Sequence, residues 1–317
     1  MSRIVPFEAA HLDQAAHLIA RRQERLMSAE PALPAAYSDP ATAHSILEAR
    51  LGEEGSLGRV ALGDGGEMTG FLLSFARLAG PWGRGQWLTL DGHAATDAET
   101  VRDLYADWAR EPTAAGFVDH FVEVPAAESA LLDGWYRLGF ARMHEYGLRE
   151  ADPSDLALTS GVELRRATMD DRAIVEHLST IINGVQAESP SFSPLTDDGR
   201  ARETADYVEE IDGPDGWWLA VDAFDRKPLG MTIFWQPDPG PAVPTHAVYL
   251  GSTMVEPAAR GRGVGRALLR FVLERGREAG AQYCVTNWRT ANLLASRTWP
   301  ALGFRTTHHR LHRRIER

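Results

Sequence analysis

The stretch that decides the fold is M-V-E-P-A-A-R-G-R-G-V-G-R-A, which occupies residues 254–267. Before it, residues 246–255 are rich in β-branched and aromatic side chains and are stopped by Pro257, so they predict a strand. After it, leucines and valines recur at helical spacing until Gly280, which predicts a helix over residues 265–279. A glycine-dense turn between a strand and a helix is typical of an anion-binding site.

The glycines of this turn, Gly261, Gly263 and Gly265, lack Cβ atoms and let a ligand approach the main-chain N–H groups. The helix N-terminus adds partial positive charge, so a phosphate or pyrophosphate suits the turn. A Walker loop is weakly supported, because Arg266-Ala267 stands where Lys and Ser or Thr belong. A dinucleotide fingerprint is equally weak, because Arg266 occupies the place of its third glycine.

The turn resembles the acyl-CoA loop of the GNAT N-acetyltransferase superfamily, which reads Gln or Arg, two residues, Gly, one residue, then Gly or Ala. Residues 260–265, R-G-R-G-V-G, satisfy that pattern. A second family element, N-x-x-A-x-x-x-Y-x-x-x-G-F, is matched by residues 292–304 after a strand expected at residues 282–286. The resemblance covers roughly residues 162–317.

Membership of this superfamily implies acetyl-CoA as co-substrate and direct transfer of its acetyl group to a primary amine in a ternary complex. The resemblance implies that a main-chain N–H at the end of the strand before the loop, that of Met254 or Val255, faces the thioester carbonyl. The residues implied to contact the cofactor are Met254, Val255, Arg260, Gly261, Arg262, Gly263, Val264, Gly265, Arg266, Asn292, Ala295 and Trp299.

The general acid is where the sequence departs from the family pattern. Trp299 stands where many relatives have a tyrosine that protonates the CoA sulfur, and an indole N–H has no useful acidity. Tyr283 is one substitute, unaided departure of the thiolate is another, and slow or absent transfer is a third. For the base, the candidates are Tyr249, Glu256 and a hydrogen-bonded water.

The acceptor site is expected between the first two helices of the C-terminal half, in the loop at residues 188–198. Carboxylates there, including Glu188 and Asp197, suit the ammonium group of a small cationic amine. A solvated loop rich in proline and serine is an equally good reading. Asn287, which ends a strand, is a further candidate for orienting substrate or water.

The two halves of the chain repeat each other at an offset of about 160 residues. Matching hairpins are predicted at residues 59–73 and 218–233, and W-Y-R-L-G-F at residues 135–140 parallels W-P-A-L-G-F at residues 299–304. The fold class is therefore α/β with mixed sheets, as two tandem GNAT-like domains, each a splayed mixed sheet flanked by helices. Mycothiol synthase has a similar tandem architecture, but no residue here specifies its substrate.

We expect a degenerate first domain over residues 1–150, a linker over residues 151–161 and an acetyl-CoA-binding domain over residues 162–317. After a strand expected at residues 86–93, the first half reads A-A-T-D-A-E-T, without glycine and with two carboxylates. Those carboxylates would repel a pyrophosphate. The first half is then left to complete the acceptor cleft, to stabilise the second half, or both.

Composition narrows the class of partner. The net charge of −11 argues against nucleic acid, and no run of about eighteen apolar residues or signal-peptide pattern points to a membrane. We therefore expect a cytoplasmic monomer or homodimer, without a metal because no histidines show ligand spacing. The basic run at residues 305–317 is expected to form a final solvated strand with charges at its edge, with a polyanion site as the alternative.

Three functions remain open at this point. An N-acetyltransferase acting on a small cationic amine is favoured by the intact loop. An acetyl-CoA-binding sensor without turnover is favoured by Trp299 at the acid position. A protein acetyltransferase is favoured by the spare N-terminal half.

Overall fold

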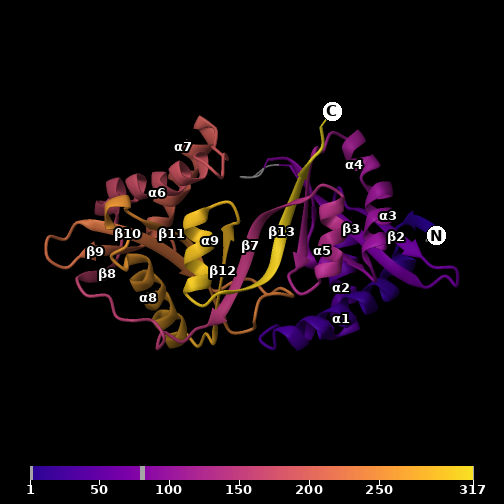
Figure 1. Ribbon diagram of the computed structural model, residues 1–317, viewed down its shortest axis with the longest axis horizontal. Coiled ribbons are helices and arrows are strands. Elements are labelled where there is room, and N and C mark those ends of the chain that lie inside the picture. Colours follow the sequence, from indigo (N-terminus) through magenta and orange to yellow (C-terminus); the bar gives the residue numbers. More distant parts are fainter. Residues whose placement is uncertain (1–2, 79–82, 317) are drawn as a thin grey trace. The chain divides into compact units, whose positions relative to one another are not determined.

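The computed structural model describes residues 3–78 and 83–316, and the chain falls into two compact units (Figure 1). Unit 1 comprises Met1–Tyr146, Pro239–Thr245 and Thr306–Arg317, and unit 2 comprises Gly147–Asp238 and His246–Arg305. Each unit therefore contains a segment from the other half of the sequence. The expected domain ranges, 1–150 and 162–317, lack this exchange.

Unit 1 is a mixed sheet with helices on both faces. Its strand order is β1-β2-β3-β4-β6-β13, with the short β5 paired to β3. Its elements are β1 (Arg3–Pro6), α1 (Leu12–Ala29), α2 (Pro40–Leu51), β2 (Leu57–Leu62), β3 (Met68–Arg77), β4 (Gly85–Leu88), β5 (His93–Ala95), α3 (Ala98–Trp108), α4 (Arg110–Ala114), β6 (Asp119–Pro125), α5 (Ser129–Arg137), the first half of β7 (Ala141–Glu150) and β13 (Arg305–Arg314).

Unit 2 repeats this plan with the strand order β8-β9-β10-β11-β12-β7. Its elements are β8 (Val162–Arg166), α6 (Arg172–Ala187), α7 (Asp197–Glu209), β9 (Trp218–Asp222), β10 (Pro228–Trp235), β11 (Ala247–Val255), α8 (Val264–Glu278), β12 (Tyr283–Arg289), α9 (Leu293–Ala301) and the second half of β7. The predicted strand before the glycine turn and the helix after it are both confirmed within a residue at each end.

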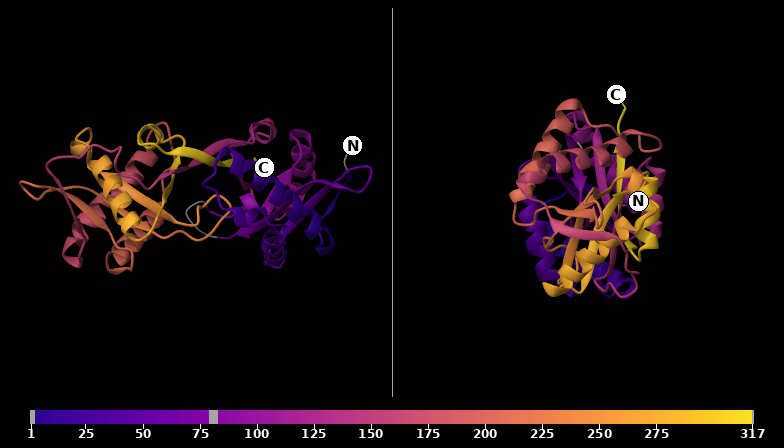
Figure 2. Two further views of the ribbon diagram at one scale, coloured as in Figure 1. Left: turned by 90° about the horizontal axis from the view of Figure 1, so that it is seen from below. Right: turned by 90° about the vertical axis from the view of Figure 1, so that its left-hand side faces the viewer.

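Alternation along the strands divides each core between the two faces of its sheet. On β3, Phe71 and Leu73 pack against α1 and α2, whereas Leu72 between them packs against α3 and α5. Figure 2 shows these helix pairs from two further sides. On β9, Leu219 and Val221 likewise face α6 and α7. Both predicted hairpins are confirmed as antiparallel pairs, β2 with β3 and β9 with β10.

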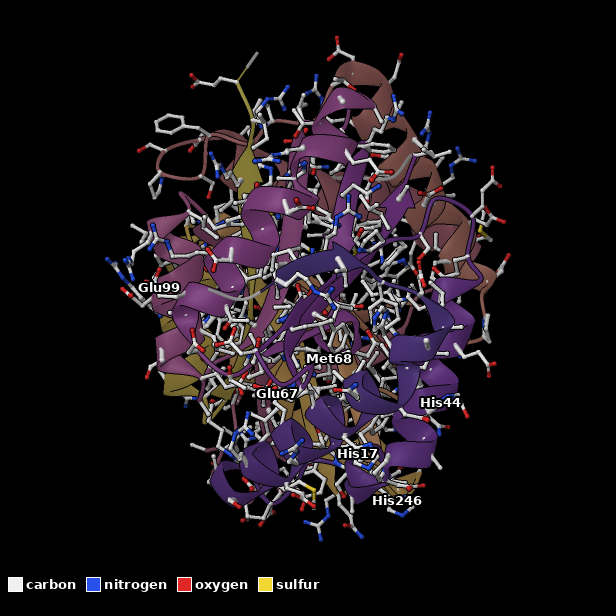
Figure 3. The ribbon with its side chains drawn as sticks, turned by 90° about the vertical axis from the view of Figure 1, so that its right-hand side faces the viewer. His17, His44, Glu67, Met68, Glu99 and His246 are labelled. Carbon is white, nitrogen blue, oxygen red and sulfur yellow. The ribbon has the colours of Figure 1, made fainter. Side chains whose placement is uncertain are left out.

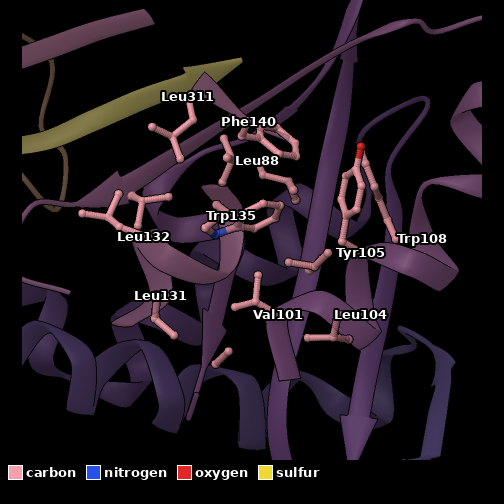
Figure 4. Close-up of a cluster of buried hydrophobic side chains, with 14 of the residues drawn as sticks. Leu88, Val101, Leu104, Tyr105, Trp108, Leu131, Leu132, Trp135, Phe140 and Leu311 are labelled. Atoms are coloured by element: carbon pink, nitrogen blue, oxygen red, sulfur yellow. The ribbon is translucent and has the colours of Figure 1, made fainter. Parts of the chain in front are cut away.

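The last strand of each unit comes from the other half of the chain. The C-terminal strand β13 pairs antiparallel with β6 of unit 1, from His308 opposite Pro125 to Arg314 opposite Asp119. Figure 4 shows Leu311 of β13 beside Trp135 and Phe140 in the unit 1 core. Reciprocally, β7 is the neighbour of β12 in unit 2. The strand expected at residues 305–317 is confirmed as β13, but the expectation that it is solvated is wrong, because β13 lies between β6 and β7 and buries Leu311, His308 and His309.

The strand expected at residues 86–93 is also wrong, because β4 ends at Leu88 and β5 begins at His93. Between them a single 3-10 turn is closed by the Gly92 N–H, which donates to the Thr89 carbonyl at 2.8 Å. The buried guanidinium of Arg22 donates to the main-chain carbonyls of Leu90 and His93. These hydrogen bonds satisfy main-chain carbonyls that would otherwise pair with a neighbouring strand.

Candidate active site

The glycine loop joins β11 to α8 in unit 2 through a short 3-10 turn at Pro257–Ala259. Gly261 has φ +79° and Gly263 has φ +82°, a left-handed conformation that only glycine adopts readily. Gly263 is the N-cap of α8, and the first helical bond runs from the Ala267 N–H to its carbonyl at 2.9 Å. The N–H groups of the first turn therefore have no intrahelical acceptor.

The space beside the loop fits an anion such as a pyrophosphate. A Cβ atom on Gly261 would meet nothing within 4 Å, so the main chain there is open to a ligand. Arg262 donates to Asp222 at the end of β9, with an Nη2···Oδ2 distance of 2.7 Å. Within the described residues Arg260 and Arg266 are exposed and have no ion-pair partner. Their charges remain available to a bound anion.

Residues 151–161, expected from the sequence to be a linker, contact the glycine loop and α8. Thr159 donates from its hydroxyl to the Gly263 carbonyl at 3.3 Å, and its side chain lies where a Cβ on Gly263 would sit. Arg270 of α8 donates to the carbonyls of Pro153 and Leu156 at 2.9 and 2.8 Å. Residues 151–161 therefore pack on unit 2 and brace the helix whose N-terminus forms the anion site.

β11 and β12 separate just before the glycine loop. Their parallel register runs only from Ala247 opposite Tyr283 to Tyr249 opposite Val285, although β11 continues to Val255. On the other side of β11 the pairing with β10 shifts by one residue between Thr232 and Phe234, which places a bulge in β11 after Leu250. The predicted splay of the sheet is confirmed in unit 2.

The register also decides which main-chain groups face the opening. The Glu256 N–H donates to the Leu229 carbonyl of β10 at 2.9 Å. Because N–H groups alternate along an antiparallel strand, Met254 also points toward β10, whereas Thr253 and Val255 point toward the side from which β12 has departed. Of the two expected carbonyl-facing donors, Val255 is therefore the one directed into the opening.

Two polar side chains meet where the strands part. Asn287 of β12 donates from its amide to the Tyr249 hydroxyl. The Tyr249 ring stacks on Trp235 of β10, with ring centroids 4.7 Å apart. Tyr249 is thus held in one orientation by a stack and a hydrogen bond, with its polar end in the splay. Tyr249 and Asn287, expected separately from the sequence, form one unit.

The structure separates the remaining acid and base candidates. Glu256 follows β11, and its Oε1 lies 2.5 Å from Nε2 of His177 on α6. Tyr283 lies at the opposite end of the sheet, because it pairs with Ala247 at the start of β11. The structure does not bring Tyr283 to the loop, so we do not carry it forward as an acid. Nothing in the local sequence marks His177, an exposed helical histidine, as the partner of Glu256.

The second family element forms α9 and its N-cap. The Asn292 Oδ1 accepts from the N–H groups of Leu294 and Ala295 at 3.1 and 3.2 Å, which leaves only its amide N–H groups for a ligand. Trp299 is 8% exposed and packs edge-on against Phe304 in the unit 2 core. Trp299 is therefore a packing residue of the unit 2 core.

On the acceptor side, Glu188 and Asp197 are exposed, and Asp197 is paired with Arg200 one turn along α7. The structure brings together four other groups that the sequence left unmarked. Asn183 of α6 donates from Nδ2 to Glu203 Oε2 at 2.6 Å. The Tyr207 hydroxyl lies 3.0 Å from Ser252 Oγ, on the bulge of β11.

Burial, with a smaller contribution from the negative charge of Glu203, raises the pKa of Tyr207 to about 12. Tyr207 is therefore a neutral hydrogen-bonding group at physiological pH rather than an acid or base. Its spacing along α7 puts it on the same face as Glu203 one turn earlier. A carboxylate and a hydroxyl thus lie on one face of α7, where the carboxylate contacts Asn183 of α6 and the hydroxyl contacts the bulge of β11.

Unit 1 has no counterpart of the glycine loop. Only Thr96 and Asp97 separate β5 from α3. Asp97 caps α3, since its Oδ1 accepts from the Thr100 N–H at 2.8 Å, and that bond holds the pKa of the carboxyl below its usual value. The helix N-terminus that would receive a phosphate is thus occupied by a side chain of the chain itself.

No group of three or more His, Cys, Asp or Glu suited to a metal occurs among the described residues. Figure 3 shows His17 on α1 and His44 on α2, well apart from Glu99 on α3. None of the helices in the described ranges is long and apolar enough to cross a membrane.

Comparison with known proteins supports the same fold. Residues 184–304 match the model of the acetyltransferase (GNAT) family. A GCN5-related N-acetyltransferase from Sphaerobacter thermophilus is similar over 100% of this chain and 96% of its own, with a TM-score of 0.60 and 15% identity. A tandem GNAT protein from the clavulanic acid biosynthesis pathway is similar over 100% and 99%, with a TM-score of 0.51 and 17% identity.

A third similar structure is a GCN5-related glucosamine N-acetyltransferase region of a fungal multi-domain β-N-acetylglucosaminidase. It covers 98% of this chain and 38% of that one, with a TM-score of 0.56 and 11% identity. No curated protein matches the sequence. At these identities the similar structures establish the fold, and the family match over residues 184–304 is to an acetyltransferase model.

Proposed function

We propose that the chain is a GNAT acetyltransferase, as the family match over residues 184–304 supports, and that unit 2 transfers an acetyl group from acetyl-CoA to a primary amine of a small, cationic molecule. The observation that carries this proposal is the glycine loop at the mouth of the splay. Gly261 and Gly263 hold it open with positive φ, and it leads directly into α8. Exposed Arg260 and Arg266 stand beside it.

Acetyl-CoA, when bound, supplies the activated acetyl group. The loop N–H groups, Arg260 and Arg266 hold its phosphates, while Asn292 and Ala295 at the start of α9 flank its arm. The Val255 N–H, directed into the opening, donates to the carbonyl oxygen as negative charge develops there. A fixed main-chain donor is effective because it needs no reorganisation during the reaction.

On the acceptor side, Glu203 attracts the ammonium group, and Asn183 holds the carboxylate in place through its 2.6 Å hydrogen bond. The hydrogen-bonded hydroxyl groups of Tyr207 and Ser252 extend the polar surface of Glu203 and Asn183 to the bulge of β11. The amine must lose a proton before it attacks. Tyr249, oriented by Asn287, positions the amine or the water that takes its proton.

Glu256 and His177 are a second route for that proton, since a carboxylate and an imidazole 2.5 Å apart form a ready acceptor pair. Trp299 cannot protonate the departing sulfur, so the C–S bond breaks without an acid and the CoA thiolate takes its proton from water. Glu188 and Asp197 act at the outer edge of the acceptor site, as exposed charges that attract a cation.

Isothermal titration of acetyl-CoA tests the cofactor half of the proposal. Gly263→Glu puts a carboxylate and backbone strain into the loop, and binding is expected to fall at least a hundredfold. The matched control is Gly280→Glu, which places the same residue at another positive φ, +92°, beyond the other end of α8. Equal loss in both variants would contradict a site at the loop.

Thiol release with a panel of amines then tests transfer. We expect faster thiol release with diamines than with monoamines that have no second cationic group. Glu203→Gln should reduce this release without loss of acetyl-CoA binding. Binding without release for any amine would instead favour an acetyl-CoA sensor, a function for which Trp299 in place of an acid argues. Release with lysine peptides alone would favour a protein acetyltransferase.

A further inference from the structure

The glycine loop of unit 2 is anchored at both ends by buried side chains. Ala259 and Val264, which flank it, belong to one apolar cluster with Ala220 of β9 and Leu229 of β10. Between these anchors, residues 260–263 form an arch that is exposed, or half-buried at its last position. The N–H groups of residues 260 and 262 make long main-chain hydrogen bonds, each 3.3 Å. The main chain alone therefore determines the conformation of this glycine-rich arch only weakly.

A side-chain ion pair holds the middle of the arch. Arg262, between Gly261 and Gly263, donates from Nη2 to Asp222 Oδ2 at 2.7 Å. The other oxygen of Asp222 accepts from the Phe224 N–H at 3.0 Å, within the turn that joins β9 to β10. The hydrogen bond from Arg262 holds the pKa of Asp222 below its usual value, so both partners are charged at physiological pH. One carboxylate thus ties the arch to a turn that it also stabilises.

This pair gives Arg262 a role different from that of Arg260 and Arg266. A guanidinium matched by a carboxylate adds little net charge for an anion beside the loop. The side chains of Arg262 and Asp222 are 48% and 20% exposed, and an ion pair of this kind adds little to the stability of the fold. It matters more for a ligand, because a loop that is ordered before binding loses less conformational freedom when the ligand binds.

We propose that Asp222 is a positioning residue for the cofactor site, acting through Arg262, and that Arg262 is an anchor of the loop rather than a ligand of the phosphates. The role of Asp222 rests on the function proposed for unit 2. The pair holds the arch in the conformation that presents its N–H groups to the phosphates, while Arg260 and Arg266 supply the positive charge. The sequence implied Arg262 as a cofactor contact and gave no sign of its partner, which lies 40 residues earlier.

The sign of one substitution separates positioning from simple electrostatics. Asp222→Asn removes a negative charge beside an anion site and releases Arg262, so electrostatics alone predicts tighter binding of acetyl-CoA. Positioning predicts weaker binding, because the arch would occupy its binding conformation only part of the time. The asparagine keeps an oxygen for the Phe224 N–H, so the turn is retained. In titration calorimetry on the full chain, we expect the Kd of acetyl-CoA to rise about three- to fivefold.

The matched control is Asp225→Asn, because Asp225 lies in the same turn but pairs with Lys227 at 2.6 Å. Its Kd for acetyl-CoA should stay the same or fall. Arg262→Gln should weaken binding as Asp222→Asn does, and the double variant should bind no more weakly than Arg262→Gln alone. With an amine that the parent acetylates, the KM for acetyl-CoA should rise in Asp222→Asn while kcat is unchanged.

Trypsin tests the hold on the loop in the ligand-free protein. The bond after Arg260 lies in the exposed arch, and proteases cut such a loop faster when it leaves its folded conformation more often. Asp222→Asn should be cut there about threefold faster than the parent, or more, whereas Asp225→Asn should be cut at the parent's rate. Fragment masses identify the bond, and melting curves establish that each variant is folded.

Asp222 has no positioning role if Asp222→Asn binds acetyl-CoA as tightly as the parent or more tightly. The same holds if the double variant binds more weakly than Arg262→Gln, or if cleavage after Arg260 is unchanged. Failure of the parent itself to bind acetyl-CoA would count against the function proposed for unit 2. In that case the cleavage rates alone decide whether Asp222 holds the loop.

Discussion

Replacing Leu311 by Ala is expected to destabilise unit 1, although Leu311 lies close to the C-terminal end of the sequence. Leu311 is 0% exposed and belongs to the same cluster as Trp135 and Phe140 of the N-terminal half (Figure 4). Its main chain is paired with Val122 in the middle of the β6–β13 register. The substitution therefore opens a cavity in the N-terminal core without removing a backbone bond.

The matched substitution is Leu148→Ala, in the part of β7 that belongs to unit 2. Leu148 is also 0% exposed, so both variants lose the same atoms from a fully buried site. Truncating a buried leucine to alanine costs about 2–5 kcal/mol. Because a domain is stable by only about 5–15 kcal/mol, the affected unit should lose a large part of its free energy of unfolding.

Hydrogen exchange followed by mass spectrometry reads the two units separately. In Leu311→Ala, amides of β6 and α5 should exchange faster, while those of α8 and β12 keep their protection. Leu148→Ala should give the opposite pattern. If Leu311→Ala accelerated exchange mainly in α8 and β12, or if both variants affected both units equally, the assignment of exchanged strands would be refuted.

Three further predictions follow from buried ionisable groups. Burial raises the pKa of Cys284 to about 12, so this thiol should not react with Ellman's reagent at pH 8 until the protein is unfolded; rapid labelling of folded protein would contradict its burial. Hydrogen bonds from Arg165 lower the pKa of Asp171 to about 2, so Asp171→Asn should lower the free energy of unfolding at pH 7 by on the order of 2 kcal/mol, measured by urea unfolding. The difference between the variant and the parent should shrink as the pH falls from 4 toward 2, and an undiminished difference in acid would exclude this cause. Burial lowers the pKa values of four histidines in unit 1 below the ordinary 6.5, so on acidification these side chains take up protons in the unfolded state before they do so in the folded state. Unit 1 should therefore lose stability as the pH falls below 6.5, and its amides should lose protection from hydrogen exchange before those of unit 2. Earlier loss of protection in unit 2 would contradict this reasoning. The four histidines are His93 and His308, with pKa values of about 3, and His120 and His309, with pKa values of about 4.

The cofactor side of the site could be predicted because its signals are local. Positive φ at Gly261 and Gly263 requires glycine, and the strand and helix beside them each carry their own periodicity. The splay also followed from the family pattern. Its cause, a register that stops at Tyr249 and a bulge after Leu250, is set by pairing between strands.

The acceptor side could not be predicted because it depends on contacts between elements far apart in the sequence. Asn183 and Glu203 are ordinary polar residues of two helices until the packing of α6 on α7 joins them. Tyr283 was a reasonable acid by type, but the parallel register puts it at the wrong end of β12. Spacing along one strand does not reveal which end lies at the site.

Strand exchange was equally hidden, since β7 and β13 carry patterns that specify a strand but not its partner. It has a consequence for the N-terminal half. A chain cut within residues 151–161 would leave unit 1 without β13 and unit 2 without the second half of β7. Each fragment would then expose an unpaired strand edge and an open core, so neither half is a self-contained folding unit. The N-terminal half is thus needed to complete the sheet that holds the glycine loop.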